Sequence, residues 1–448
     1  MRRCHVLLLA LALPLLALAA VAAVAAPAAR APVVIQHALW DASQKPLYQQ
    51  CAVDFERLHP DIRIVIRQQG WDDYWTSLST GFVADTAPDV FADHLSQFPE
   101  QVDNGVLLDI APLVARDHVA TDIYEDGLYA NWGRGAAQYA LPADWDTVAL
   151  AVNLDRARAA GITPDELRRL NWNPRDGGSF GRVAARLTRD AAGRDALSPA
   201  FDRSRVVERG YQTAGSGGMM GQTEWSPFAV SAGFTFQDAP WRAPLHYDAP
   251  VLAQTLDWIV ALARAGISAT PEQLGRLGAE AMFASGRVAM IAVGSWMVGY
   301  FRREAHFHYA FVPLPVGPLG YRATMRNGLA HAIWSGTPHP EQAWLWLRYL
   351  GSPACQSVVA AGGVVYPALR GAGALAAAAQ RSAGSDPQAF FEMARAHTYA
   401  PPIISHAPQI KDLIGDAIDA VLLGRARASA LLPRANALAN ALLKATPP

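Results

Sequence analysis

The hydrophobic pattern near the start of the chain predicts two strands joined by a helix. Residues 33–40 form a nearly continuous apolar run, which is typical of a parallel strand buried on both faces. Residues 45–58 place their apolar side chains on one stripe of a helix. Ile62, Ile64 and Ile66 then alternate with other residues, and this period of two predicts a strand with one better-buried face.

Helices and strands continue to alternate along the chain. Gly70 ends the second strand, and Asp72 and Asp73 follow at the start of a second helix, where carboxylates complement the helix dipole. A short strand is predicted at residues 89–91. Strand, helix, strand in this order is the unit of a parallel α/β sheet. Later strands are predicted at 139–153, within 283–290, at 309–315 and at 327–333, and later helices at 164–170, 249–265, 340–350 and 408–443.

Length and composition indicate a globular protein of two domains. The chain has 448 residues, too many for one simple core. Hydrophobic residues make up 51% and charged residues 17%, which excludes a disordered chain. The formal net charge of −1 gives no attraction toward nucleic acid or an anionic membrane surface.

The N-terminus has the composition of a secretory signal peptide, predicted at residues 1–28. Arg2 and Arg3 precede an apolar run from Val6 to about Val24, which ends in small residues. The alternative is a membrane anchor, because the run approaches the roughly 20 residues needed to span a bilayer. Cys4 lies ahead of the run, so it is not a lipoprotein attachment site. We expect cleavage and a periplasmic location.

Two cysteines, Cys51 and Cys355, remain after the predicted cleavage. Export permits a disulfide, but two cysteines so far apart in sequence specify none. Each lies in a helical pattern, where cysteine is usually a small buried hydrophobe, and the sequence leaves open whether they are free. No Cys/His spacing indicates a metal site, and we expect no cofactor.

Several motifs, taken in order, resemble those of a known family. They are Phe55-Glu56, His59-Pro60-Asp61-Ile62, Trp71-Asp72-Asp73-Tyr74, Ala87-Pro88-Asp89-Val90-Phe91, Phe283 to Met290, and Gly294-Ser295-Trp296. The chain resembles the extracellular solute-binding proteins of ABC importers, family 1, the maltose-binding-like sugar binders. The resemblance covers most of the chain and is weakest from 156 to 240.

The resemblance implies a fold and a function. The fold is an α/β, two-lobed periplasmic-binding-protein fold of type II, in which each lobe is a mostly parallel sheet flanked by helices and the ligand cleft lies between them. Residues 31–146 plus 309–350 would form the N-terminal lobe, and 147–308 plus 351–448 the C-terminal lobe. The protein would capture a mono- or oligosaccharide outside the cytoplasmic membrane and deliver it to the membrane subunits of an ABC importer. It would be a monomer without enzymatic activity.

A sugar site needs flat aromatic rings and acidic groups around one cleft. Aromatic rings cover the apolar face of a sugar, and carboxylates accept strong hydrogen bonds from its hydroxyls. Ligands of open α/β sheets lie beyond the carboxyl ends of the strands. By resemblance, Asp146 replaces a ligand-binding acid and Trp296 a stacking aromatic. The predicted ligand-binding residues are Trp40, Asp72, Tyr74, Asp93, His94, Asp144, Trp145, Asp146, Trp225, Trp296, Asn327, Gly328 and Tyr366.

Other interpretations of the same residues remain open. Trp71, Trp75, Trp344 and Trp346 lie in helical patterns, so we expect them to pack rather than to bind. Paired carboxylates also suit a secreted glycoside hydrolase, with Asp144 and Asp146 or Asp93 as the pair.

A non-sugar solute, such as a peptide or a glycerophosphodiester, is a further alternative. No basic cluster is evident near the predicted site, which argues against a phosphate group. Residues 177–181 fit a nucleophile elbow, but that motif follows a strand, and none is predicted there.

Overall fold

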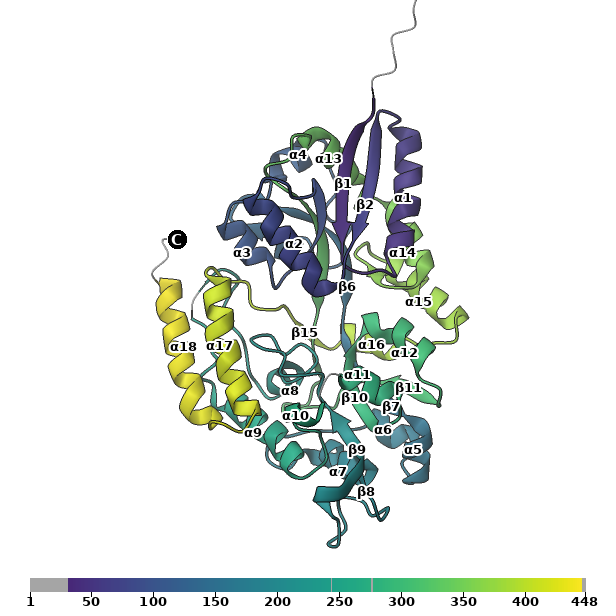
Figure 1. The fold of residues 1–448 in the computed structure, drawn as a ribbon, viewed down its shortest axis with the longest axis vertical. Coiled ribbons are helices and arrows are strands. Elements are labelled where there is room, and N and C mark those ends of the chain that lie inside the picture. The colour runs from purple at the N-terminus through teal and green to yellow at the C-terminus, as the bar shows by residue number, and fades with distance from the viewer. Residues whose placement is uncertain (1–30, 243, 275–276, 445–448) are drawn as a thin grey trace, which may run out of the picture.

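The computed structural model describes residues 31–242, 244–274 and 277–444, and its strands form two main sheets, one in each lobe (Figure 1). The predicted signal peptide lies outside the described residues. Within these ranges, no helix combines the length and the apolar character that crossing a bilayer requires. The predicted two-lobed α/β architecture is confirmed.

The N-terminal lobe is built on a six-stranded sheet in the order β14-β6-β13-β3-β1-β2. Its strands are β1 (Val33–Leu39), β2 (Ile62–Gln68), β3 (Val90–His94), β6 (Ala140–Asp146), β13 (Asn327–Ile333) and β14 (Tyr366–Pro367). One core packs this sheet against α1 (Lys45–Leu58), α13 (Pro340–Leu350) and α14 (Pro353–Gly362). A second core packs its other face against α2 (Trp71–Val83) and α3 (Phe98–Asp103). The strands and helices predicted for residues 33–94 are confirmed.

The C-terminal lobe is built on a five-stranded sheet in the order β11-β7-β10-β9-β8. Its strands are β7 (Val148–Asn153), β8 (Arg189–Asp190), β9 (Val206–Gln212), β10 (Val288–Gly294) and β11 (Tyr309–Val312). Around it lie α5 (Leu154–Ala159), α6 (Pro164–Arg168), α7 (Gly178–Leu187), α8 (Ser226–Ser231), α9 (Pro250–Arg264), α11 (Ala279–Ala284), α12 (Val298–Glu304), α16 (Gln388–Ala394), α17 (Ala407–Leu422) and α18 (Ala428–Lys444).

The crossing from the first lobe to the second is the continuous run of β6 and β7. All thirteen residues of these two strands are buried, because β6 lies inside the first sheet and β7 inside the second. Thr147 separates the strands, and its hydroxyl donates to the Phe390 carbonyl at 2.9 Å. The acidic residues of β6 are therefore held in a fixed, desolvated position between the lobes.

Strand pairing differs from the sequence expectation in two respects. Tyr309–Val312 pairs with β7 in the C-terminal lobe, although residues 309–350 were expected in the N-terminal lobe. Residues 353–367, expected in the C-terminal lobe, supply α14 and β14 to the N-terminal lobe, where β14 pairs with β6. The sheets are also mixed rather than mostly parallel. A strand that returns from the other lobe, such as β13, enters against the direction of its neighbours and pairs antiparallel with them.

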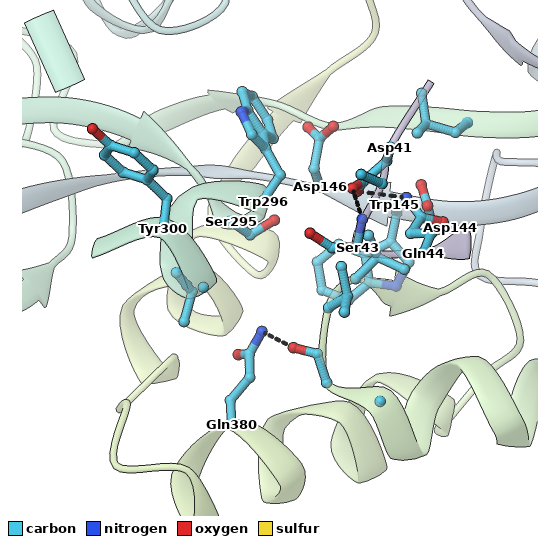
Figure 2. A pocket seen from close by; sticks show the side chains of 18 of the residues that line it. Asp41, Ser43, Gln44, Asp144, Trp145, Asp146, Ser295, Trp296, Tyr300 and Gln380 are labelled. Atoms are coloured by element: carbon cyan, nitrogen blue, oxygen red, sulfur yellow. Dashed lines mark hydrogen bonds between the residues drawn. The ribbon is translucent and has the colours of Figure 1, made fainter. Parts of the chain in front are cut away.

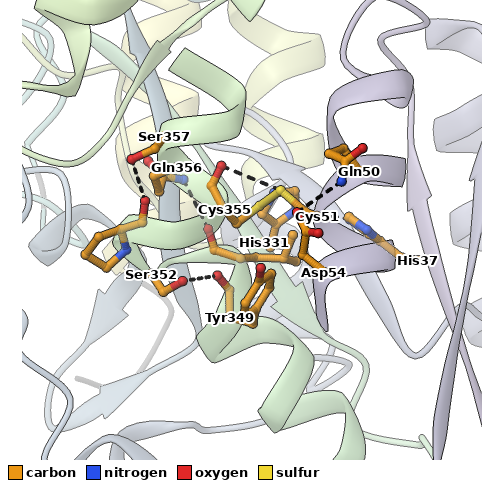
Figure 3. Close-up of a disulfide and its surroundings, with 12 residues drawn as sticks. His37, Gln50, Cys51, Asp54, His331, Tyr349, Ser352, Cys355, Gln356 and Ser357 are labelled. Carbon is orange, nitrogen blue, oxygen red and sulfur yellow. Dashed lines mark hydrogen bonds between the residues drawn. A yellow bond between two sulfur atoms is a disulfide. The ribbon is translucent and has the colours of Figure 1, made fainter. Parts of the chain in front are cut away.

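A disulfide between Cys51 and Cys355 joins α1 to α14 across 304 residues of sequence (Figure 3). The two Cα atoms are 5.2 Å apart, and both cysteines are fully buried. The sequence had left this pairing open, because only the sheet beneath brings the two helices together. Closing so long a loop restricts the unfolded chain, which stabilises the folded protein by about 2–4 kcal/mol.

Candidate functional site

A cavity of about 700 Å³ lies between the lobes, at the carboxyl ends of β1, β3 and β6 (Figure 2). The N-terminal lobe contributes strand ends and the turn after β1. The C-terminal lobe contributes the turn after β10 and the start of α12. The lining residues that carry polar or aromatic groups are Trp40, Asp41, Ser43, Gln44, Trp71, His94, Asp144, Trp145, Asp146, Gln222, Ser295, Trp296, Tyr300, Arg302, Arg303, Asn327, Gln380 and Ser385.

Two buried carboxyl groups on β6 line this cavity. Burial raises the pKa of Asp144 to about 8, and the nearby charge of Asp41 adds to the rise. Burial also raises the pKa of Asp146 well above its usual range, with repulsion from Asp144 as the next cause. Gln222 opposes this rise by donating from Nε2 to Asp146 Oδ1 at 2.7 Å. Because buried polar groups are costly without hydrogen-bond partners, both acids would be stabilised by hydrogen bonds to a polar ligand.

Exposed indole rings reach the cavity from both lobes. Trp71, at the first turn of α2, is 43% exposed, and Trp296, after β10, is 41% exposed. The Trp296 ring lies directly over the backbone of Gly294, where an added Cβ would come within 1.9 Å of it. Trp40 supports Trp71 by an edge-to-face contact, with ring centroids 5.1 Å apart. These rings offer apolar surfaces of the kind that cover the C–H face of a sugar.

Neutral hydrogen-bonding groups complete the wall of the N-terminal lobe. The side-chain nitrogen of Asn327 lies 2.8 Å from His94 Nε2. Burial lowers the pKa of His94 to about 4, and the charge of Lys411 lowers it further, so the ring is neutral at neutral pH. The side chain of Asn327 is 1% exposed and also contributes a hydrogen bond to Asp146 that lowers the pKa of this acid. Asn327 thereby links the histidine to the acidic pair.

The structure brings part of the predicted site together. The predicted residues that line the cavity are Trp40, His94, Asp144, Trp145, Asp146, Trp296 and Asn327. In Figure 2, Trp296 and Tyr300 lie on one side, and Asp41, Gln44 and Asp144 lie on the other. Trp145 is 4% exposed, and its ring packs against Tyr366 with centroids 4.9 Å apart.

Three predicted residues of the N-terminal lobe do not line the cavity. Asp72 is exposed on the first turn of α2, where its charge only complements the helix dipole. Tyr74 is 1% exposed and donates its hydroxyl to the Ala92 carbonyl at 2.5 Å. Asp93 is fully buried, and burial raises its pKa to about 8. Tyr74 and Asp93 thus lie behind the cavity wall.

Three further predicted residues also lie outside the cavity lining. Trp225 is fully buried in the C-terminal core, where its indole donates to the Gly218 carbonyl at 3.2 Å. Tyr366 is fully buried and supports Trp145 from behind. Gly328 faces Leu128, which an added Cβ would approach to 3.1 Å. These placements have one cause in common, because a position at a strand end or in a loop does not tell whether a residue faces the cleft or a core.

Sequence reasoning missed several lining residues. Trp71 was expected to pack, and no motif marked Gln222 or Tyr300. Asp41 and Gln44 follow Trp40 in the turn after β1, so the same strand-end argument would have found them. The cavity also contains Arg302 and Arg303, whereas no basic cluster was evident from the sequence.

Comparisons with known proteins agree with this architecture. The chain is 26% identical to UspC of Mycobacterium tuberculosis, with a TM-score of 0.72 over 91% of this chain and 100% of that one. It shares its fold with Lmo0181 from Listeria monocytogenes, at 17% identity and a TM-score of 0.77 over 92% and 99% of the two chains. A lipoprotein of unknown function from Streptomyces antibioticus is 25% identical over 77% of this chain and 72% of its own length.

A family model described as bacterial extracellular solute-binding protein matches residues 41–357, which include most of both lobes. This match extends over well more than half of the 448 residues. The family expected from the sequence motifs is thereby confirmed. The chain belongs to the bacterial extracellular solute-binding proteins.

Proposed function

We propose that this protein is the substrate-binding component of an ABC importer and that it captures a mono- or oligosaccharide outside the cytoplasmic membrane. The observation that carries the proposal is the pairing of exposed Trp71 and Trp296, from opposite lobes, around the buried acids Asp144 and Asp146 in one cavity. Rings supply the apolar contacts and acids the hydrogen bonds that a sugar requires. The cavity volume lies within the range of about 300–1,000 Å³ that is common for small-molecule sites.

Proteins of the same fold provide further support. Lmo0181 was crystallised in complex with cycloalternan, and a solute-binding protein of Thermotoga lettingae with α-D-tagatose. These two structures have 17% and 21% identity to this chain and TM-scores of 0.77 and 0.71. A cleft of this architecture therefore accommodates both a cyclic oligosaccharide and a monosaccharide in other proteins.

In the proposed mechanism, the N-terminal lobe binds first and the C-terminal lobe closes over the ligand. Asp144 and Asp146 accept hydrogen bonds from sugar hydroxyls, while Trp71 and Trp296 stack on opposite ends or faces of the sugar. Contacts to both lobes shift the population toward a closed form, which the importer's membrane subunits would recognise. The protein would act as a monomer and without catalysis. Residues 1–28 would be its signal peptide, which is cleaved on export, and the mature protein would be located in the periplasm.

Titration with sugars tests the proposal. Protein lacking residues 1–28 is mixed with a panel of monosaccharides, linear and cyclic oligosaccharides and polyols, and binding is followed by tryptophan fluorescence and calorimetry. We expect at least one sugar to bind with one-to-one stoichiometry and to remain chemically unchanged. Absence of binding across the panel would refute the proposal, and turnover of the bound sugar would favour a glycoside hydrolase instead.

A further inference from the structure

A second, much smaller cavity lies directly behind Asp144. Its polar lining groups are Asp41, Gln44, Tyr48, Asp144 and His331, and its apolar lining includes Leu39, Ala143 and Ala330. The volume open to the centre of a water molecule is about 10 Å³, and roughly this volume holds a single water. Asp144, Asp41 and Gln44 line the large cavity as well, so the two cavities share a wall.

An irregularity in β6 creates this shared wall. Leu329 pairs with Asp144, but the next residue, Ala330, pairs with Pro142, so Ala143 is an extra residue in the strand. Leu141 belongs to the core beneath α1 and α13. In a strand without an extra residue, Asp144 would face the side of the sheet opposite to Leu141. The extra residue places Asp144 on the same side as Leu141, where His331 and Tyr48 also lie.

Two residues that line the small cavity each carry a buried polar atom that has no protein partner among the described residues. The atoms are Asp144 Oδ2 and His331 Nε2, in side chains of residues that are 3% and 2% exposed. The other ring nitrogen of His331, Nδ1, lies 3.3 Å from His37 Nε2. Burial lowers the pKa of His331 to about 3, so the ring is neutral at neutral pH. An unpaired buried polar atom costs about 1–3 kcal/mol, so two of them beside one cavity of this size favour a bridging water.

We propose that one ordered water in the small cavity bridges Asp144 Oδ2 and His331 Nε2, which makes His331 a positioning residue for ligand binding. The bridge fixes the rotation of the Asp144 carboxyl, which also accepts a hydrogen bond from the backbone of Leu329, and so holds the carboxyl in place for a ligand hydroxyl in the large cavity. His37 in turn holds the His331 ring through Nδ1. The role in binding rests on the proposed function, whereas the water itself does not.

A crystal structure of the ligand-free protein at about 1.8 Å resolution tests the water directly. We expect one peak within hydrogen-bond distance of both Asp144 Oδ2 and His331 Nε2. An empty cavity, or a water that contacts neither atom, would overturn the proposal. This measurement needs no sugar, so it stands even if no sugar binds and the proposed function fails.

A matched pair of variants tests the positioning role. In His331→Gln, the side-chain amide reaches the position of Nε2 and keeps a hydrogen-bonding group for the water in the small cavity. In His331→Asn, the shorter amide replaces Nδ1 and keeps only the contact with His37. For whichever panel sugar the wild type binds, we expect affinity within about twofold for the Gln variant and a loss of about tenfold for the Asn variant. Equal affinity of both variants, at equal melting temperature, would contradict the role of His331.

A third variant covers the case in which both His331 substitutions prevent folding. Ala143→Val fills the small cavity without altering either polar group, because Ala143 lines it. We expect this variant to exclude the water and to weaken sugar binding about as much as His331→Asn. A folded Ala143→Val protein with wild-type affinity would show that the water has no role in binding.

Discussion

The two walls of the large cavity differ in how firmly their groups are held. On the N-terminal wall, Asp144 and Asp146 are 3% and 9% exposed and lie on a strand inside the sheet. On the C-terminal wall, Trp296 is 41% exposed, and Arg302 and Arg303 are exposed on the seven-residue helix α12. The acids of the N-terminal wall are therefore preorganised by burial, whereas the exposed side chains of the C-terminal wall can adjust around the ligand that these acids hold.

The architecture explains this difference. The N-terminal wall consists of strand ends between α1 and α2, and the disulfide at Cys51 links α1 to α14, which ends at Gly362 beside the cavity. The C-terminal wall follows β10 through a short turn, and the indole of Trp296 rests on the backbone of Gly294. If this contrast governs binding, then substitutions on the first wall cost more affinity than those on the second.

The largest expected effect is that of Asp146→Ala on the N-terminal wall. This change removes a buried acceptor and its 2.7 Å bond from Gln222, which joins the lobes. A hydrogen bond contributes about 0.5–1.5 kcal/mol, and the partly buried amide of Gln222 left without its partner costs about 1–3 kcal/mol, so we expect sugar affinity to fall about 100-fold by calorimetry. Asp72→Ala is the matched control, because Asp72 is exposed outside the cavity lining and its loss leaves affinity within about twofold. An equal loss of affinity in Asp146→Ala and Asp72→Ala would contradict the role of the N-terminal wall in holding the ligand.

Buried acids in the first wall and behind it also predict how stability depends on pH. Burial raises the pKa of Asp93 and of Asp144 from 3.8 to about 8. Between pH 6.5 and 8 the unfolded carboxyls are ionised while the folded ones still bind protons, so the free energy of unfolding falls as pH rises and levels off above about pH 9. The lowered pKa values of His94 and His331 act below pH 6.5, where they oppose this trend.

Urea denaturation at pH 6.5 and pH 9 measures this dependence. We expect roughly 1–2 kcal/mol of lost stability for each of the two carboxyls. Asp144→Asn keeps the shape of the protonated acid but does not titrate. The free energy of unfolding of this variant therefore depends less on pH than that of the wild type. An unchanged dependence would mean that Asp144 is ionised at neutral pH in the folded protein.

A smaller effect is expected from Trp296→Ala on the C-terminal wall. Loss of one partly exposed stacking ring lowers affinity about tenfold and leaves the melting temperature nearly unchanged, because the ring lies outside the hydrophobic cores. Gly294→Ala is a sharper variant, since it keeps the indole but displaces it from the backbone it covers. We expect both variants to weaken binding in parallel, and wild-type affinity in both would remove Trp296 from the site.

The sequence predicts those parts of the fold and site that depend on local periodicity. The strand pattern around Trp40 placed this residue at a strand end, and Asp144 and Asp146 lay within the strand run predicted at residues 139–153. The cavity is lined by residues of both segments. Trp71 packs against Trp40 as expected and also lines the cavity, because a helical pattern does not tell whether the first turn of a helix faces a core or a cleft.

Features that depend on distant contacts could not be predicted in this way. Trp225 shows the reverse of Trp71. It lies in an irregular segment, where a binding role was expected, but the C-terminal core buries it completely. The pairing of Cys51 with Cys355 depends on two helices brought together by a sheet, and no short-range pattern encodes it. The bulge at Ala143, which aims Asp144, likewise results from the register between β6 and β13.

The smallest effect is expected at the outer edge of the C-terminal wall. Arg302 and Arg303 are exposed and line the cavity, yet no ion pair holds either of them among the described residues. Exposed charges are screened by salt and contribute little to binding a neutral ligand. For a neutral sugar in about 0.15 M salt, we expect calorimetry of Arg302→Gln/Arg303→Gln to give an affinity within about twofold of the wild type. A loss of affinity above about tenfold that becomes smaller as salt is added would instead show that these arginines bind the ligand and that the bound sugar is anionic.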